Sequence, residues 1–208
     1  MPEPYKRVLQ RHYLNWKNCN RCPLHETRKQ VVLYRFGEDN THQQPLDILF
    51  LGESPGLSED TLGIPFSPNT PAGANLQVII NQILEDYQPF NWAITYVVAC
   101  HPPENRGPTT KECSSCAPRL LEFIAITQPS LICTIGSVSK TQFNPKTYLK
   151  LLHHNGYTDA FFETCSIPHT ANIAHKINSG EATKLILDAA STIQGALQYC
   201  NQVAHPDN

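Results

Sequence analysis

The chain has 208 residues, of which 40% are hydrophobic and 16% charged, and its formal net charge is −2. This length and composition predict one folded domain with its own core. The charge balance argues against a globally basic nucleic-acid binder but leaves a local basic face open. No apolar run approaches the ~20 residues of a membrane helix, and the N-terminal stretch lacks the apolar segment of a signal peptide. We therefore expect a cytoplasmic protein.

The apolar pattern predicts strands that alternate with helices. Helical spacing predicts helices over residues 4–18, 74–86, 111–127 and 181–200. Thr110 is expected to cap the third helix, and a loose tail is expected at about 201–208. Short apolar or β-branched runs predict strands over residues 48–51, 93–99, 131–136 and 161–167. Such alternation is typical of an α/β protein with a mainly parallel sheet.

The stretch 48–66, ILFLGESPGLSEDTLGIPF, is the most informative part of the chain. Its buried strand ends at a glycine-rich turn, Gly-Glu-Ser-Pro-Gly, and glycines let backbone N–H groups approach a ligand closely. In open α/β sheets, ligands bind outside the carboxyl ends of the strands. The turn therefore predicts a ligand site. Glu59 and Asp60, which follow it, either take part in that site or only brace the loop.

Eight cysteines in a reducing compartment indicate metal or cluster ligation rather than disulfides. One set of four ligands consists of two C-x-x-C pairs and is zinc-like: Cys19, Cys22, Cys113 and Cys116. The other set is uneven and suits an iron–sulfur cluster: Cys19, Cys22, Cys100 and Cys116. The spacing leaves both sets open. Cys133 and Cys165 lie inside apolar strands and are expected to be small buried residues.

Several motifs occur together in the order in which one known family has them. They are Cys19-x-x-Cys22-x-Leu24, Gly52-Glu53-Ser54-Pro55-Gly56 with Glu59-Asp60 and Pro65-Phe66, Val97-Val98-Ala99-Cys100 with Pro102-Pro103-Glu104-Asn105-Arg106, Glu112-x-x-x-Cys116, and His169. In this combination the chain resembles the family 4 uracil-DNA glycosylases, the group that carries a 4Fe-4S cluster. The resemblance extends from Cys19 to about Asn172.

The resemblance implies a three-layer αβα sandwich with a short, mainly parallel four-stranded sheet, in a single domain over residues 1–208. It favours the uneven ligand set for a 4Fe-4S cluster, with zinc as the alternative, so segments 19–22 and 100–116 are expected to bind the cluster. It also implies that the partner is DNA. We expect a monomer without a membrane segment.

The resemblance further implies a DNA N-glycosylase that flips a base out of the duplex and hydrolyses its bond to the sugar. His169 is then the donor to the leaving base, and Glu53 and Asp60 are candidates for positioning the water. The residues expected to contact the base are Ser54, Phe66, Tyr96 and Thr170. Arg106 and Asn172 are expected to contact the DNA.

Three departures from the family bear on the substrate. Tyr96 stands where the family has an asparagine that pairs with uracil, and a phenol cannot give the paired donor and acceptor of an amide. Thr170 follows the histidine in place of a proline, and the loop over residues 68–71 is longer. The departures suggest that the substrate is a modified, bulky pyrimidine of the kind found in some phage genomes. Two biological roles are then open: repair of the cell's own DNA and defence against foreign DNA. The alternatives are a cluster-bearing DNA-binding module with lost catalysis and an unrelated zinc protein.

Overall fold

We describe the protein from a computed structural model, which covers residues 5–37, 45–85, 87, 91–174, 176 and 181–204. Five strands form one sheet in the order β1-β3-β2-β4-β5. They are β1 (Tyr34–Phe36), β2 (Ile48–Gly52), β3 (Trp92–Tyr96), β4 (Leu131–Ile135) and β5 (Glu163–Ile167). β1 runs antiparallel to β3, and all other neighbouring strands run parallel.

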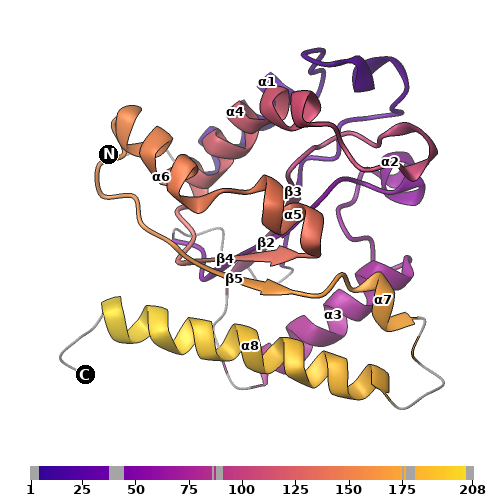
Figure 1. Ribbon diagram of the computed structural model, residues 1–208. Coiled ribbons are helices and arrows are strands. Elements are labelled where there is room, and N and C mark those ends of the chain that lie inside the picture. Colours follow the sequence, from indigo (N-terminus) through magenta and orange to yellow (C-terminus); the bar gives the residue numbers. More distant parts are fainter. Residues whose placement is uncertain are drawn as a thin grey trace.

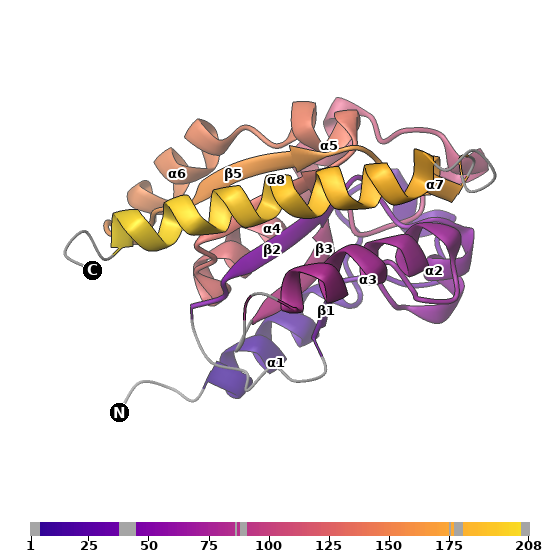
Figure 2. The same cartoon turned by 90° about the horizontal axis from the view of Figure 1, so that it is seen from below.

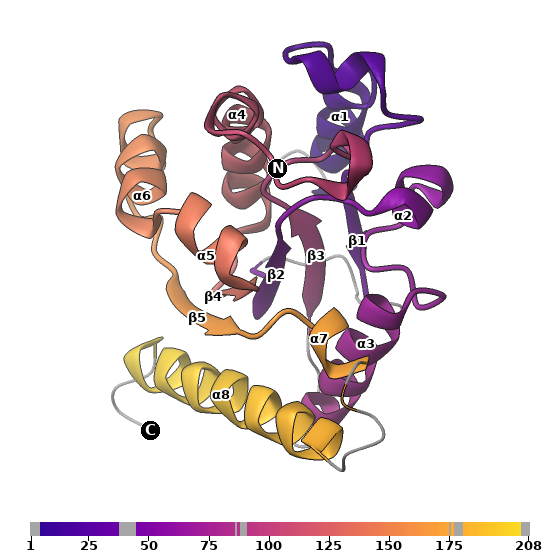
Figure 3. The same ribbon diagram turned by 45° about the vertical axis from the view of Figure 1, so that its right-hand side comes forward.

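Helices cover both faces of this sheet. They are α1 (Tyr5–Trp16), α2 (Leu57–Leu62), α3 (Pro71–Leu84), α4 (Thr110–Thr127), α5 (Ser137–Gln142), α6 (Pro145–His154), α7 (Ala171–Ala174) and α8 (Glu181–Ala204), with the 3-10 turns η1 (Pro23–Glu26) and η2 (Pro103–Asn105). Helices α1, α4 and α6 lie on one side of the sheet, and α3 and α8 lie on the other (Figures 1 and 3). Seen from below, α8 and α3 pack against each other across that face (Figure 2).

The central strand β2 shows why helices cover both faces of the sheet. All five of its residues are buried. Leu49 and Leu51 join the core beneath α1 and α4, whereas Ile48 and Phe50 join the core beneath α3 and α8. A strand with apolar side chains on both faces is stable only between two apolar layers. The three-layer αβα fold predicted above is confirmed, and all four predicted strands are present and parallel, although the one expected from residue 161 begins at Glu163.

The fifth strand, β1, was not predicted. It has three residues, all half-buried, and it pairs with β3 at the edge of the sheet. Three residues carry too little periodicity to indicate a strand. The predicted strand 93–99 ends earlier, at Tyr96, where the chain bends. Beyond this bend, Val97 and Val98 still donate backbone hydrogen bonds to the carbonyls of Gly52 (2.9 Å) and Glu53 (3.0 Å), which holds the two loops together.

Several helix ends differ from the prediction; α1 ends at Trp16 and α3 at Leu84, each two residues earlier than expected. Thr109, not Thr110, caps α4: its hydroxyl accepts from the Glu112 N–H (3.2 Å), and the Glu112 carboxylate accepts from the Thr109 N–H (2.7 Å). Helix α3 begins at Pro71, earlier than expected, behind a Thr70 cap. Helix α8 continues to Ala204, so the expected tail is helical over 201–204, and 205–208 lie outside the described residues. None of the described helices is long and apolar enough to cross a membrane.

Candidate active site

A cavity of about 630 Å³ lies beyond the carboxyl ends of the parallel strands. Its walls come from the loop after β2 with the start of α2, the Phe66 turn with the start of α3, the loop after β3, and the turn between β5 and α7. Helices α2 and α7 lie at this end of the sheet (Figure 1). The cavity brings together Glu53, Phe66 and His169, which are far apart in the sequence.

Two stacked aromatic rings form the buried wall of this cavity. The rings of Phe66 and Tyr96 are 5.4 Å apart at an angle of 18°, and the Phe66 N–H donates to the Tyr96 hydroxyl at 2.9 Å. The structure requires a glycine at position 52, because an added Cβ would lie 2.5 Å from Cε2 of Phe66. Phe66 is only 2% exposed, so a base can stack on its ring face only if covering side chains move.

The two acids of α2 have different environments. Asp60 is buried, and its carboxylate accepts from the backbone N–H groups of Lys29 (2.9 Å) and Gln30 (3.4 Å). It is not among the residues that line the cavity, and its hydrogen bonds tie α2 to the segment before β1, which agrees with the interpretation that Asp60 braces the loop. Glu59 does line the cavity, and its carboxylate accepts from the Gly56 N–H at 2.7 Å.

Glu53 and Ser54 follow β2 directly and line the cavity, half-buried. Burial raises the pKa of the Glu53 carboxyl above its usual value. A carboxylate held partly out of water is a stronger hydrogen-bond acceptor and a better base than a solvated one. The arrangement thus places an acid with a perturbed pKa in the cavity, which is a common property of catalytic groups.

His169 enters the cavity from the turn between β5 and α7. Burial lowers the pKa of its imidazole, which favours the neutral ring. The Ala171 N–H donates to Nδ1 at 3.2 Å, so in the neutral ring the proton sits on Nε2. His169 is therefore a neutral donor. Its ring lies 6.3 Å from that of Phe66 at a tilt of 37°, and it packs against Gly136, where an added Cβ would lie 3.2 Å from Cδ2.

Thr170 does not line the cavity, although we predicted that it contacts the base. Its side chain is fully buried, and its hydroxyl donates to the Ala72 carbonyl at 2.8 Å. The Asn75 amide in turn donates to the Thr170 carbonyl at 2.9 Å. Thr170 therefore fixes the histidine turn to helix α3 and contributes to the site by holding His169 in place.

The two predicted DNA contacts lie at the surface. Arg106 borders the cavity, and its guanidinium donates to both Glu112 carboxylate oxygens at 2.7 and 2.9 Å. This pairing lowers the pKa of Glu112 to about 2 and offsets much of the charge that Arg106 could offer a phosphate. Asn172 is exposed on α7, outside the cavity lining. Contact of either residue with DNA stays a prediction.

Two residues that sequence reasoning missed also shape the site. His101 lines the cavity and is 8% exposed, and its Nδ1–H donates to the Pro55 carbonyl at 2.9 Å. Arg119 on α4 is fully buried, where its guanidinium donates to the Thr95 hydroxyl at 2.9 Å and to the Tyr96 carbonyl. The Cys-His-Pro-Pro sequence could have pointed to His101, since it follows a strand end. Nothing in the local pattern of α4 indicates Arg119.

Cys100 belongs to the core on the α1 and α4 side of the sheet, and Cys19, Cys22 and Cys116 pack against that core. The pKa of the Cys100 thiol is raised to about 12, mainly by burial. The charge of nearby Arg28 acts to lower this pKa, whereas the charges of Cys116, Cys22 and Cys19 act to raise it. The Ala99 N–H also donates to the Cys116 sulfur at 3.5 Å. The charges of Cys116 and Cys19 also contribute to the raised pKa of the Cys22 thiol, after burial. Among the described residues, no three His, Cys, Asp or Glu side chains form a group fit for one metal ion.

Cys113 shares the neighbour Cys116 with this set, and its other charged neighbours are Glu112 and Glu53. The pKa of its thiol is raised to about 11, mainly by burial and to a smaller extent by the charges of Cys116, Glu112 and Glu53. Cys133 and Cys165 face each other across β4 and β5. Cys133 is fully buried and Cys165 partly so, which agrees with the expected packing role.

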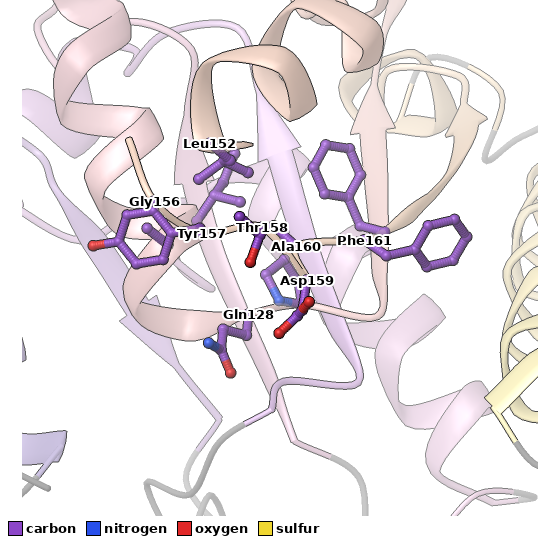
Figure 4. Close-up of a pocket in the computed structure, with 12 residues that line it drawn as sticks. Gln128, Leu152, Gly156, Tyr157, Thr158, Asp159, Ala160 and Phe161 are labelled. Atoms are coloured by element: carbon purple, nitrogen blue, oxygen red, sulfur yellow. The ribbon is translucent and has the colours of Figure 1, made fainter. Parts of the chain in front are cut away.

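A second cavity, of about 480 Å³, lies at the opposite end of the sheet, next to the starts of β4 and β5. The loop after α6 and the end of α4 line it; Figure 4 labels Gln128, Tyr157, Asp159 and Phe161 among its residues. None of the predicted site residues lines this cavity. The first cavity is therefore the candidate active site.

The fold and this cavity define an α/β protein whose ligand site lies outside the carboxyl ends of its parallel strands. The family model described as "Uracil DNA glycosylase superfamily" matches residues 40–189. The chain therefore belongs to the uracil-DNA glycosylase superfamily. This match includes the cavity residues named above, Cys100 and Cys116, whereas Cys19 and Cys22 precede it.

Curated relatives narrow the comparison. The chain is 37% identical over 124 residues to the type-4 uracil-DNA glycosylase of Pyrobaculum aerophilum, covering 59% of this chain and 58% of that protein. It is 36% identical over 139 residues to the type-4 enzyme of Saccharolobus solfataricus, covering 65% of this chain and 58% of that protein. It is also 36% identical over 127 residues to the type-4 enzyme of Thermotoga maritima, covering 61% of each chain. The chain thus spans about three fifths of the length of these relatives. The predicted resemblance to this group is confirmed.

Proposed function

We propose that the chain is a monofunctional DNA glycosylase that hydrolyses the N-glycosidic bond of a flipped-out pyrimidine and leaves an abasic site. One observation carries the proposal: Glu53, Phe66 and His169 line a single cavity. Superfamily membership and the similarity to proteins named type-4 uracil-DNA glycosylases support it.

His169 is the proposed electrophilic donor. As the bond between sugar and base lengthens, the bonding electrons pass to the base and negative charge develops on its carbonyl oxygen. A neutral Nε2–H aimed at that oxygen stabilises the transition state more than the ground state. Because the ring is already neutral, no proton has to leave before it donates. Removing a donor of this kind costs on the order of 10²–10³ in rate.

Glu53 is the proposed partner of the water nucleophile. Its carboxylate can hold the water and stabilise the positive charge that develops on the sugar, and it can accept the proton as the water oxygen bonds to the sugar carbon. None of the described residues that line the cavity is a lysine. A Schiff-base intermediate therefore has no candidate nucleophile there, which supports hydrolysis without strand cleavage.

We also propose that Cys19, Cys22, Cys100 and Cys116 hold a 4Fe-4S cluster. Four thiolates are a donor set that suits such a cluster, and the mutual influence of these four thiols supports the choice over Cys113. The bound cluster would tie the segment after α1 to the loop after β3 and to α4. Its role is therefore structural, since it would brace the loop that carries His101 to Arg106.

The substrate is either uracil or a modified pyrimidine, and Tyr96 favours the second. A site that hydrogen-bonds one base edge strongly rejects bases lacking that edge, and this site has a phenol where the family has an amide. A bulky modified base, as in some phage genomes, suits a cavity of about 630 Å³, and defence against foreign DNA is the matching role. Release of uracil alone would match repair of the cell's own DNA.

The test is a single-turnover assay on duplexes that carry uracil, 5-hydroxymethylpyrimidine or a glycosylated pyrimidine, with abasic sites detected by alkali. We expect product with the wild type, and a loss on the order of 10²–10³ for Glu53→Gln and His169→Asn. His154→Asn, at an exposed histidine of α6 outside the cavity, is the matched control and should retain the wild-type rate.

Two results would contradict the proposal. If the wild type retains DNA without forming alkali-labile sites, the chain is a binding module and not a glycosylase. If it releases uracil efficiently and leaves every modified base in place, the modified-base substrate is wrong while the glycosylase proposal stands.

A further inference from the structure

The cavity contains a second histidine, and its free ring nitrogen is an acceptor. His101 is 8% exposed, and its Nδ1–H donates to the Pro55 carbonyl at 2.9 Å. A carbonyl oxygen only accepts, so in the neutral ring the proton sits on Nδ1 and Nε2 carries a lone pair. Among the described residues none donates to Nε2, and Nε2 is not one of the unpartnered side-chain atoms that are closed off from solvent. Because His101 lines the cavity, Nε2 opens into it.

His169 carries its proton on the opposite ring nitrogen. Its Nδ1 accepts from the Ala171 N–H at 3.2 Å, which leaves the proton on Nε2. Both histidines line the same cavity, so one ring offers a donor there and the other offers an acceptor. Two like groups that their surroundings hold in different states can act at two different points of one reaction. The donor of His169 serves the leaving base, and the acceptor of His101 is available for another group.

His101 lies on the wall that carries Glu53. The loops after β2 and β3 are bonded to each other on both sides of this residue, because the Val98 N–H donates to the Glu53 carbonyl at 3.0 Å and His101 donates to the Pro55 carbonyl. The Glu53 side chain also reaches the second loop, where an added Cβ at Gly107 would lie 3.2 Å from its Oε1. No described residue donates to the Glu53 carboxylate. Two acceptors without a protein donor are thus carried by two bonded loops.

We propose that His101 is a catalytic residue that holds the nucleophilic water together with Glu53. This inference rests on the proposed function. A water molecule has two protons, and the two acceptors bind one each. As the water oxygen bonds to C1′ of the sugar, the bond from C1′ to the base breaks and its electrons leave with the base. One water proton passes to Glu53, and the other stays on the new hydroxyl, bonded to Nε2 of His101. With both O–H bonds directed in this way, an oxygen lone pair points at the sugar carbon.

Two substitutions separate this role from bracing of the loop. In His101→Asn the amide NH₂ takes the place of Nδ1 and can still donate to Pro55, but no atom takes the place of Nε2. In His101→Gln the amide oxygen takes the place of Nε2, and the bond to Pro55 is lost. We expect His101→Asn to keep its Tm and to slow single-turnover excision about 10-fold, the value of one hydrogen bond. His101→Gln should lose roughly 2–4 °C in Tm and stay within about 3-fold of the wild-type rate.

The matched controls are His154→Asn and His154→Gln, at the exposed histidine of α6 outside the cavity, and both should leave rate and Tm unchanged. The slowing by His101→Asn should be the same factor on every base that the wild type releases, because the water is common to all these reactions.

The outcomes separate this inference from the proposed function. If His101 only braces the loop, the order of the rates is reversed: His101→Gln is the slower variant and His101→Asn keeps the wild-type rate. Either result overturns the inference while the wild type stays active. A slowing by His101→Asn that differs about 10-fold among the released bases would show that Nε2 contacts the base, which also overturns it. If the wild type releases no base from any duplex, the proposed function fails and the role of His101 fails with it.

Discussion

Replacing Gly52 with alanine tests the aromatic wall of the cavity most sharply. The added Cβ would lie 2.5 Å from Cε2 of Phe66 and 2.8 Å from Cδ1 and Cε1 of Tyr96. Carbon atoms pack at about 3.5–4.0 Å, so the rings must retreat by roughly 1 Å. Overpacking of this kind costs about 2 kcal/mol. For a chain of this length, we expect a fall in Tm of roughly 4–8 °C.

The effect on the reaction should exceed the effect on stability. Misplacing a positioned group by about 1 Å can cost on the order of 10²-fold in rate, so we expect about that loss for Gly52→Ala in single-turnover excision at a temperature where the variant is folded. Gly195→Ala is the matched control, because an added Cβ in α8 meets nothing within 4 Å; it should keep the rate and gain about 0.5–1 kcal/mol. A Gly52→Ala variant with the wild-type rate and Tm would refute the reasoning.

Three further predictions follow from the site. Burial lowers the pKa of His169, so the unfolded chain takes up a proton below about pH 6.5 before the folded one does; stability should fall as the pH drops through this range. Denaturant titrations at pH 7.5 and 5.5 should show that the free energy of unfolding falls less between these pH values in His169→Asn than in the wild type. Cys100→Ser should lose iron and visible absorption, whereas Cys113→Ser should keep both; equal loss would contradict the ligand set. Leu57 lines the cavity and is 57% exposed, so it can fill the gap left by an extruded base. We expect Leu57→Ala to slow excision about 10-fold from duplex and not from single-stranded DNA, and Leu62→Ala, 47% exposed on the same helix, to change neither.

The pattern of residues along the chain was enough to predict the layers of the fold and the position of the candidate site. Apolar runs such as residues 48–51 have no polar alternation, and a strand of that kind must be covered on both faces. Glu53 follows that strand directly, and a turn after a parallel strand lies at the ligand-binding edge. These inferences succeed because burial and turn chemistry are local properties that each segment carries in its own residues.

The hydrogen-bond partners of the side chains around the site could be seen only in the folded chain. Thr170 was expected at the base and instead bonds to Ala72, and Asp60 supports the backbone at Lys29. Tyr96 was expected to contact the base, and the structure adds that its hydroxyl accepts from the N–H of Phe66, 30 residues away. A residue's type gives its capacity to donate or accept, but its partner depends on which strands become neighbours. That pairing is fixed by the packing of the whole chain, which no local pattern contains.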